Sequence, residues 1–165
     1  MPDLRILVRA PEKMSTERIQ EILSRKESWI QASRLRIQEL TANASTEKLT
    51  FEDIEVLKQQ AIADFRLRTE NYAKSMGVSF EKISVRCQTS RWGSCSHKGN
   101  LSFNCLLMLA PETVRDYVVV HELCHRKYMN HSPAFWATVA DVLPDYRQAK
   151  NWLKENGYSL IARIK

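Results

Sequence analysis

The chain has 165 residues, of which 44% are hydrophobic and 27% charged, a composition typical of a folded globular protein and not of a disordered one. Its formal net charge of +6 permits an anionic partner such as a nucleic acid, but no long basic block identifies one. Because the apolar runs are too short to cross a bilayer and no secretory signal pattern opens the chain, we expect a cytoplasmic protein without a membrane partner, forming a single domain over residues 1–165.

The first part of the chain, residues 1–77, is predicted to be mostly helical. Residues 4–9 have the pattern of a short strand. Ser15 is a suitable N-cap, and apolar residues then recur at helical spacing, which predicts one helix over residues 16–40. We expect the aromatic residues of this part, Trp29 among them, to lie in the core.

A second long helix is predicted after a polar loop. Thr50 with Asp53 three residues later resembles a capping box, in which each side chain accepts a hydrogen bond from the other residue's backbone N–H. Apolar residues then recur on roughly one face of the helix. Gly77 follows them and is a natural place for the helix to end.

The pattern changes to alternating polar and apolar residues in the part of the chain that follows, residues 78–165. Strands are predicted over residues 83–87 and 101–105, with the segment Arg91–Ser96 and a turn at Lys98–Gly99 between them. These segments predict a small antiparallel or mixed β-sheet next to a helix. The fold class that follows is α+β.

Three shorter helices are predicted in the same part of the chain. The first begins at Glu112, which follows a proline, and continues to about Lys127. The second begins after Ser132, because serine is a good N-cap and a proline follows it. The last is predicted over residues 146–156, with Gly157 as its stop.

The most informative motif is His121-Glu122-Leu123-Cys124-His125, which has the form H-E-x-x-H. Two histidines four residues apart lie on the same face of a helix, where both can bind one tetrahedral metal ion. Glu122 is rotated about 100° from His121 and can lie beside the metal. There it can take a proton from metal-bound water and hand it to a leaving group. The motif therefore predicts a zinc-dependent hydrolase.

A catalytic zinc usually has three protein ligands and keeps one position for water. His131, six residues after His125, would return to the metal through a chain reversal. The alternative third ligands are the carboxylates of Asp141, Asp145 and Glu155. The spacing of the three histidines equals that of the metzincins, but Tyr128 stands at their glycine position and no methionine follows Met129. Those two departures exclude metzincin membership.

Four segments together resemble a known family. They are RWGSCS at 91–96, NLSFN at 100–104, YVVVHELCH at 117–125 and NHSPAFW at 130–136. These segments closely resemble the YgjP-like zinc metallopeptidases, which are zincin-like proteins related to the WLM and SprT-like groups. The resemblance extends more loosely over residues 4–157.

The resemblance implies a zincin-like fold in which a helix carries the first two metal ligands and a short sheet borders the cleft. It also implies a zinc ion bound by His121, His125 and His131, with Glu122 as the catalytic acid and base. Each of these residues matches the motif of the family at its own position.

Arg91, Trp92, Gly93 and Ser94 are the candidate substrate-binding residues. Small residues here would let the backbone approach the metal cleft, and an edge strand beside a peptidase site can pair with an extended substrate. The alternative is structural: Trp92 anchors the core and Gly93 forms a bulge.

Three functions are compatible with the motif. The first is a metallopeptidase, in which metal-activated water attacks the peptide bond of a peptide or protein substrate and Glu122 is the general base. The second is a metal-dependent nucleoside triphosphate pyrophosphatase, because basic residues surround the motif, although no Gly-rich phosphate loop is present. The third is a nucleic-acid-associated module with a structural metal, whose fourth ligand would come from Cys95, Cys124 or an acid. Otherwise we expect the four cysteines to be free thiols.

Overall fold

The computed structural model describes residues 6–42 and 47–164. The chain divides into two compact units, residues 1–46 and residues 47–165, and each is described here by itself. A single domain over the whole chain stays a prediction. No helix in the described ranges combines the length and the apolar character that crossing a membrane would require.

The first unit contains two helices where one was predicted. They are α1 (Thr16–Arg25) and α2 (Glu27–Ala42). Ser15 caps α1 as expected, since its hydroxyl accepts a hydrogen bond from the Arg18 N–H at 3.3 Å. Lys26 interrupts the helical geometry, and α1 has no buried residue whose packing would hold one long helix together.

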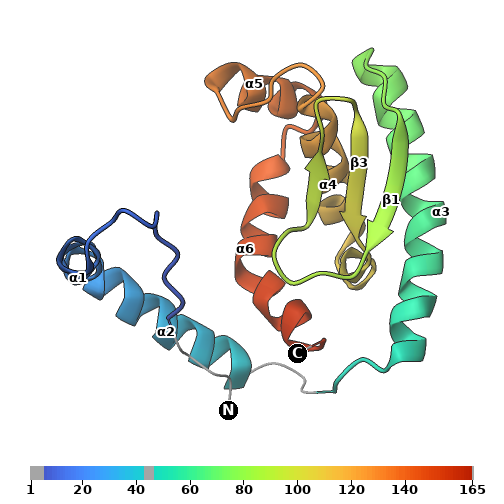
Figure 1. Ribbon diagram of the computed structural model, residues 1–165. Helices are drawn as coiled ribbons and strands as arrows, with labels where there is room; N and C mark the ends of the chain where they lie inside the picture. The colour runs from blue at the N-terminus through green and yellow to red at the C-terminus, as the bar shows by residue number, and fades with distance from the viewer. Residues whose placement is uncertain (1–5, 43–46, 165) are drawn as a thin grey trace. The chain divides into compact units, whose positions relative to one another are not determined.

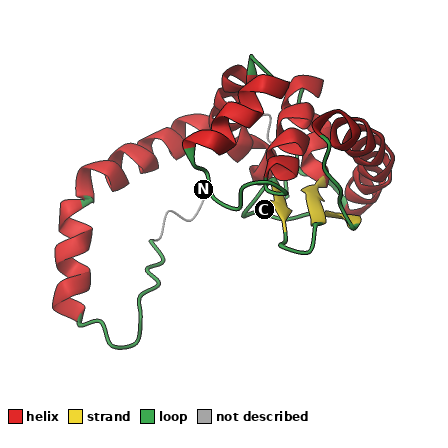
Figure 2. Ribbon diagram, turned by 90° about the horizontal axis from the view of Figure 1, so that it is seen from above, coloured by secondary structure: helices red, strands yellow, loops and turns green. Residues whose placement is uncertain are grey.

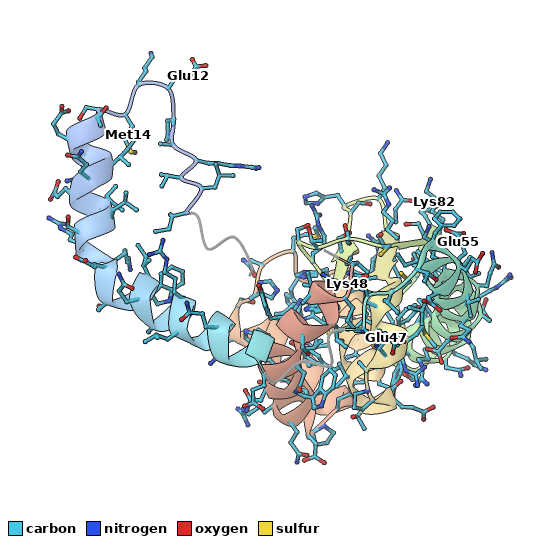
Figure 3. The ribbon with its side chains drawn as sticks, turned by 90° about the horizontal axis from the view of Figure 1, so that it is seen from below. Glu12, Met14, Glu47, Lys48, Glu55 and Lys82 are labelled. Atoms are coloured by element: carbon cyan, nitrogen blue, oxygen red, sulfur yellow. The ribbon has the colours of Figure 1, made fainter. Side chains whose placement is uncertain are left out.

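Two further predictions for this unit are wrong. Residues 6–9 form no strand, because a strand needs a hydrogen-bonded neighbour and no described segment pairs with them. Residues 4–5 lie outside the described residues. Trp29 is 67% exposed and does not lie in a core. Helical spacing predicted an apolar face but could not predict what covers it. Figure 3 shows Glu12 and Met14 near the turn that precedes α1.

The second unit begins with α3 (Phe51–Met76), and both of its predicted ends are confirmed. The Asp53 N–H donates to Thr50 Oγ1 at 3.1 Å, and the Thr50 N–H donates to Asp53 Oδ2 at 2.8 Å. Gly77 ends the helix at φ +61°, a left-handed conformation that glycine adopts without strain.

Three strands follow, and they form a mixed sheet. They are β1 (Lys82–Arg86), β2 (Gly93–Cys95) and β3 (Asn100–Asn104). The strand order is β1-β3-β2, with β1 parallel and β2 antiparallel to the central strand β3. The predicted turn between β2 and β3 is present: Gly99 adopts φ +85°, and its N–H donates to the Ser96 carbonyl at 2.8 Å. Because β3 lies in the centre of the sheet, β2 is an edge strand.

The remaining elements are helical. They are the 3₁₀ helix η1 (Cys105–Leu109) and the helices α4 (Glu112–Cys124), α5 (Pro133–Val142) and α6 (Tyr146–Ala162). Figure 1 shows α3 running alongside β1, and in Figure 2 the strands lie along one side of the helices of this unit. Phe65 of α3 stacks on Phe103 of β3 with ring centroids 4.6 Å apart, and both side chains are fully buried. The core therefore lies between the sheet and the helices α3 and α4.

Charged side chains also join α3 to the beginning of α4. Arg68 donates to Asp64 at 2.8 Å on its own helix and to Asp116 of α4 at 2.6 Å. Arg115 of α4 lies 3.3 Å from the second oxygen of Asp64. These side chains are between 12% and 22% exposed, so solvent screens them only in part.

Two predicted helix ends are wrong, each for a physical reason. Helix α4 ends at Cys124 and not near Lys127, because the chain tightens: the Arg126 N–H donates to the Leu123 carbonyl at 2.9 Å. Helix α6 continues through Gly157, where a Cβ atom would lie 2.8 Å from the Trp92 ring. Gly157 thus allows a close contact with Trp92 and does not end the helix.

Candidate metal centre

Helix α4 and the loop after it bring the three predicted histidines together. His121 lies in the last turn of α4, His125 caps the helix, and His131 follows in the loop before α5. Their ligand atoms all lie within 4.8 Å of one another, and the Nε2 atoms of His121 and His131 are 3.0 Å apart. Two imidazoles on a tetrahedral zinc ion, with Zn–N bonds of about 2.05 Å, would have nitrogens about 3.3 Å apart. The donor set and its spacing fit such an ion.

The orientation of His125 is set by the turn that ends α4. Its Nδ1 atom lies 3.0 Å from the carbonyl oxygen of Tyr128, which can only accept a hydrogen bond. The proton of a neutral His125 ring is therefore on Nδ1, and Nε2 is the atom left to bind a metal. A backbone carbonyl that fixes the tautomer is a common partner of metal-binding histidines.

His131 is positioned by the start of α5. Ser132 caps this helix as predicted, with its hydroxyl accepting a hydrogen bond from the Phe135 N–H at 3.4 Å. The Phe135 ring is fully buried, and its centroid lies within 5.0 Å of the ring centroids of all three histidines. Phe135 therefore forms an apolar support for the whole cluster.

The cluster has no other member in the part of the chain that the structure describes. The three alternative ligands are outside it, as are the cysteines, which are free thiols. Burial lowers the pKa of His121 to about 3, and the neighbouring His125 adds to this effect. His121 is therefore neutral near pH 7, which is the form of imidazole that binds a metal.

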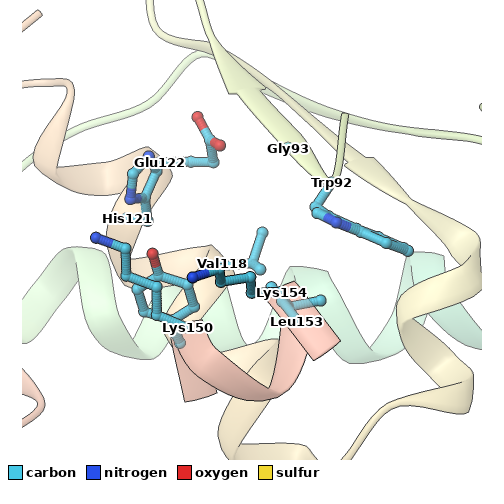
Figure 4. Close-up of a pocket in the computed structure, with 9 residues that line it drawn as sticks. Trp92, Gly93, Val118, His121, Glu122, Lys150, Leu153 and Lys154 are labelled. Atoms are coloured by element: carbon cyan, nitrogen blue, oxygen red, sulfur yellow. The ribbon is translucent and has the colours of Figure 1, made fainter. Parts of the chain in front are cut away.

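The side chain of Glu122, next to His121, points toward the edge strand β2. Its side chain is buried, which raises the pKa of the carboxyl to about 8, while the positive charge of Arg91 opposes that shift. A Cβ atom at Gly93 would lie 2.5 Å from Glu122 Oε1. Figure 4 shows Gly93 facing the carboxyl group of Glu122. A glycine is therefore required at position 93 for Glu122 to occupy this place.

A cavity of about 360 Å³ opens beside Glu122. It is lined by Trp92, Gly93, Tyr117, Val118, His121, Glu122, Lys150, Leu153 and Lys154. Sequence reasoning missed five of these residues: Tyr117 and Val118 of α4, and Lys150, Leu153 and Lys154 of α6. The only sequence signal for Lys150 and Lys154 is their spacing of four, which any solvated helix also shows.

The four candidate substrate-binding residues are placed differently. Trp92 and Gly93 line the cavity, Arg91 acts on Glu122 through its charge, and Ser94 is not among the lining residues. Asn104 was missed by sequence reasoning: it is fully buried, and its side-chain amide donates to the Arg91 carbonyl at 3.1 Å. That bond holds the backbone of the segment next to the site.

Comparisons with known proteins identify the family and the fold of the chain. The model of the YgjP-like metallopeptidase domain matches residues 52–156, which contain the three histidines and Glu122. The crystal structure of the metallopeptidase zymogen abylysin from Pyrococcus abyssi has a similar fold, with a TM-score of 0.50 and 20% identity over 55% of this chain and 93% of that one. No curated protein matches the chain. The chain belongs to the YgjP-like metallopeptidase family and has a helix-rich α+β fold of the zincin type.

Proposed function

We propose that this protein is a zinc-dependent metallopeptidase, in which His121, His125 and His131 hold the metal and Glu122 is the general base. The observation that carries the proposal is the meeting of three imidazoles beside a buried carboxyl group. A zinc ion held there would act as a Lewis acid, which polarises a substrate carbonyl and makes water more acidic. Family membership supports a protein or peptide as the substrate.

Glu122 moves the proton in this proposal. It accepts a proton from the attacking water and gives it to the amine that leaves when the peptide bond breaks. Contact with Gly93 holds the carboxyl group beside the histidines. A general base works best when its pKa lies near the working pH, and burial moves that of Glu122 upward.

The substrate would bind along β2. Among the described residues this strand pairs with β3 alone, so its other edge can form backbone hydrogen bonds with an extended peptide. Gly93, the first residue of β2, lines the cavity together with Glu122. A peptide paired to β2 would therefore pass directly in front of the proposed base.

The pyrophosphatase alternative retains one specific support, the two lysines that line the cavity and could bind phosphates. The structural-metal alternative has less support. A structural zinc needs a fourth protein ligand, and within the described ranges the cluster contains no cysteine or carboxylate.

Replacing Glu122 by Gln tests the mechanism and separates the two enzymatic functions. The zinc-loaded wild type and Glu122→Gln are compared on an unfolded protein and on nucleoside triphosphates, with zinc content measured for both. We expect the variant to keep its zinc and to lose proteolysis by about 10³-fold, within the range for loss of a general base. Glu155→Gln, an exposed carboxylate on α6, is the matched control.

Each other outcome has a definite meaning. Proteolysis that continues unchanged in Glu122→Gln would show that Glu122 is not the base. Hydrolysis of nucleotides but not of protein by the wild type, lost in the variant, would establish the pyrophosphatase instead.

A further inference from the structure

One wall of the cavity beside Glu122 is formed by three residues of α6. Leu153 and Lys154 follow Lys150 by three and four residues, which places each of them next to Lys150 on the helix surface. Both lysines are exposed, so a ligand entering from solvent can reach them. Figure 4 shows all three on the side of the cavity opposite Glu122 and Gly93.

The ammonium group of Lys150 is held in place. It lies over the Trp136 ring, 4.0 Å from the ring centroid, at a distance where cation–π attraction is effective. Trp136 itself stacks on His131 with ring centroids 5.7 Å apart. Lys150 thus contacts the aromatic ring that stacks on His131, close to the histidine cluster.

The acidic and the basic groups of the cavity lie on opposite sides. Among the described residues that line it, Glu122 is the one acid, and it lies across the cavity from the two lysines. Trp92, Val118 and Leu153 add apolar surface. A suitable ligand therefore has a short apolar stem and a negatively charged end, and the volume of about 360 Å³ is within the range of small-ligand sites.

We propose that this cavity binds a carboxylate of the peptide substrate close to the bond that is cut, with Lys150 and Lys154 as the residues that select it. The proposal rests on the peptidase function proposed above. The carboxylate can come from an Asp or Glu side chain or from the C-terminus of the peptide. The apolar walls favour these over a phosphate, because a carboxylate is carried on a hydrocarbon stem.

The test uses the full-length zinc-loaded protein and matched peptides. Three peptides share one sequence: one has Glu at the varied position and an amidated C-terminus, one has Gln there, and one has Gln with a free C-terminus. Cleavage is measured as kcat/KM with the wild type. Binding is measured separately by fluorescence anisotropy of labelled peptides with Glu122→Gln, so that affinity is known even where cleavage is slow.

We expect a carboxylate-bearing peptide to be preferred about tenfold, as one charge-assisted hydrogen bond near a surface would give. Lys150→Met and Lys154→Met should each reduce this preference, whereas Lys82→Met should leave it unchanged. Lys82 lies in β1, the strand at the other edge of the sheet, and is labelled in Figure 3. Which of the two carboxylate peptides is preferred identifies the source of the carboxylate.

The results separate this proposal from the peptidase function. Preferential binding of a carboxylate peptide without any cleavage would support the cavity and reject the peptidase. Equal binding and equal cleavage of all three peptides, or no measurable binding of any, would overturn the cavity proposal. A preference that persists in both lysine variants would overturn it as well, because the carboxylate would then be recognised elsewhere.

Discussion

The two ends of helix α4 are built in opposite ways. At its beginning, Arg115 and Asp116 are paired with Asp64 and Arg68 of α3. At its end, the Nδ1 atom of His121 is buried without a hydrogen-bond partner among the described residues. Glu122 is buried beside it, and burial disfavours its charged form. One end pairs its charged groups, and the other buries groups to which the proposed function assigns metal binding and catalysis.

The difference shows where the fold can tolerate unfavourable groups. Buried polar atoms without partners typically cost about 1–3 kcal/mol each. Such unfavourable arrangements persist where the surrounding structure fixes the geometry, and they are most common at functional sites. Here the ion pairs between α3 and the beginning of α4 help to fix the position of the helix. Substitutions at the beginning of α4 should therefore change stability, and those near its end should change activity.

The largest effect on stability is expected for Arg68→Met. Removing the guanidinium leaves two partly buried carboxylates, Asp64 and Asp116, without it, which should cost about 2 kcal/mol, below the range for a fully buried pair. Arg66→Met is the matched control: Arg66 is 75% exposed and pairs with Glu70 on the same helix, so we expect about 0.5 kcal/mol or less. Urea unfolding measures both. Equal losses of unfolding free energy in the two variants would show that the ion pairs between α3 and α4 contribute no more than an exposed pair.

Zinc content and peptide cleavage sharpen the same comparison. Both should remain at wild-type levels in folded Arg68→Met, because the substitution lies at the other end of α4. A loss of zinc binding in this variant would mean that the two ends of the helix are coupled.

The opposite pattern is expected for Gly93→Ala. A Cβ atom at this position meets Glu122 Oε1 at 2.5 Å, so the carboxyl group must move away from its place. A displaced general base should reduce kcat/KM by about tenfold to a hundredfold, while zinc content and unfolding free energy change little. Ser84→Ala on β1 is the control. Full activity in Gly93→Ala would show that this contact does not position Glu122.

The smallest effect is expected for Gly157→Ala. The new methyl group would press on the Trp92 ring at 2.8 Å, and the gain in helix propensity offsets part of that cost, leaving a loss of about 1 kcal/mol. Trp92→Phe should relieve the contact. A double-mutant cycle tests this, because Gly157→Ala should become neutral or stabilising when Trp92 is replaced. Additive changes in unfolding free energy for the two substitutions would show that the Gly157–Trp92 contact does not cause the loss.

Local chemistry explains what the sequence predicted correctly. The Thr50–Asp53 capping box and the Ser132 cap depend on residues a few positions apart, so their pattern is complete in the sequence. The spacing of His121 and His125 on one helix is equally local. His131 was predicted from the number of ligands that a catalytic zinc needs, and the structure brings it to the other two.

Contacts between distant residues explain what could not be predicted. Gly157 was expected to end a helix, because nothing in its neighbourhood shows that Trp92 packs against it. Trp29 has helical spacing but stays 67% exposed among the described residues of its unit. Lys150 and Lys154 have the spacing of solvated lysines, and only the tertiary structure places them in one cavity with His121 and Glu122. Each case depends on tertiary structure that periodicity does not contain.

Zinc binding is the property that shows whether the three histidines form a metal site. Zinc per chain and zinc affinity are measured for the wild type, Glu122→Gln and His131→Ala after removal of metal and equilibration with zinc. We expect about one zinc ion per chain for the first two proteins, with stability raised by about 4 kcal/mol at a zinc concentration 1,000 times Kd. His131→Ala should bind zinc at least about tenfold more weakly, with a smaller gain in stability. Wild-type zinc affinity in His131→Ala would show that His131 is not a ligand. No zinc binding by the wild type would show that the three histidines form no zinc site.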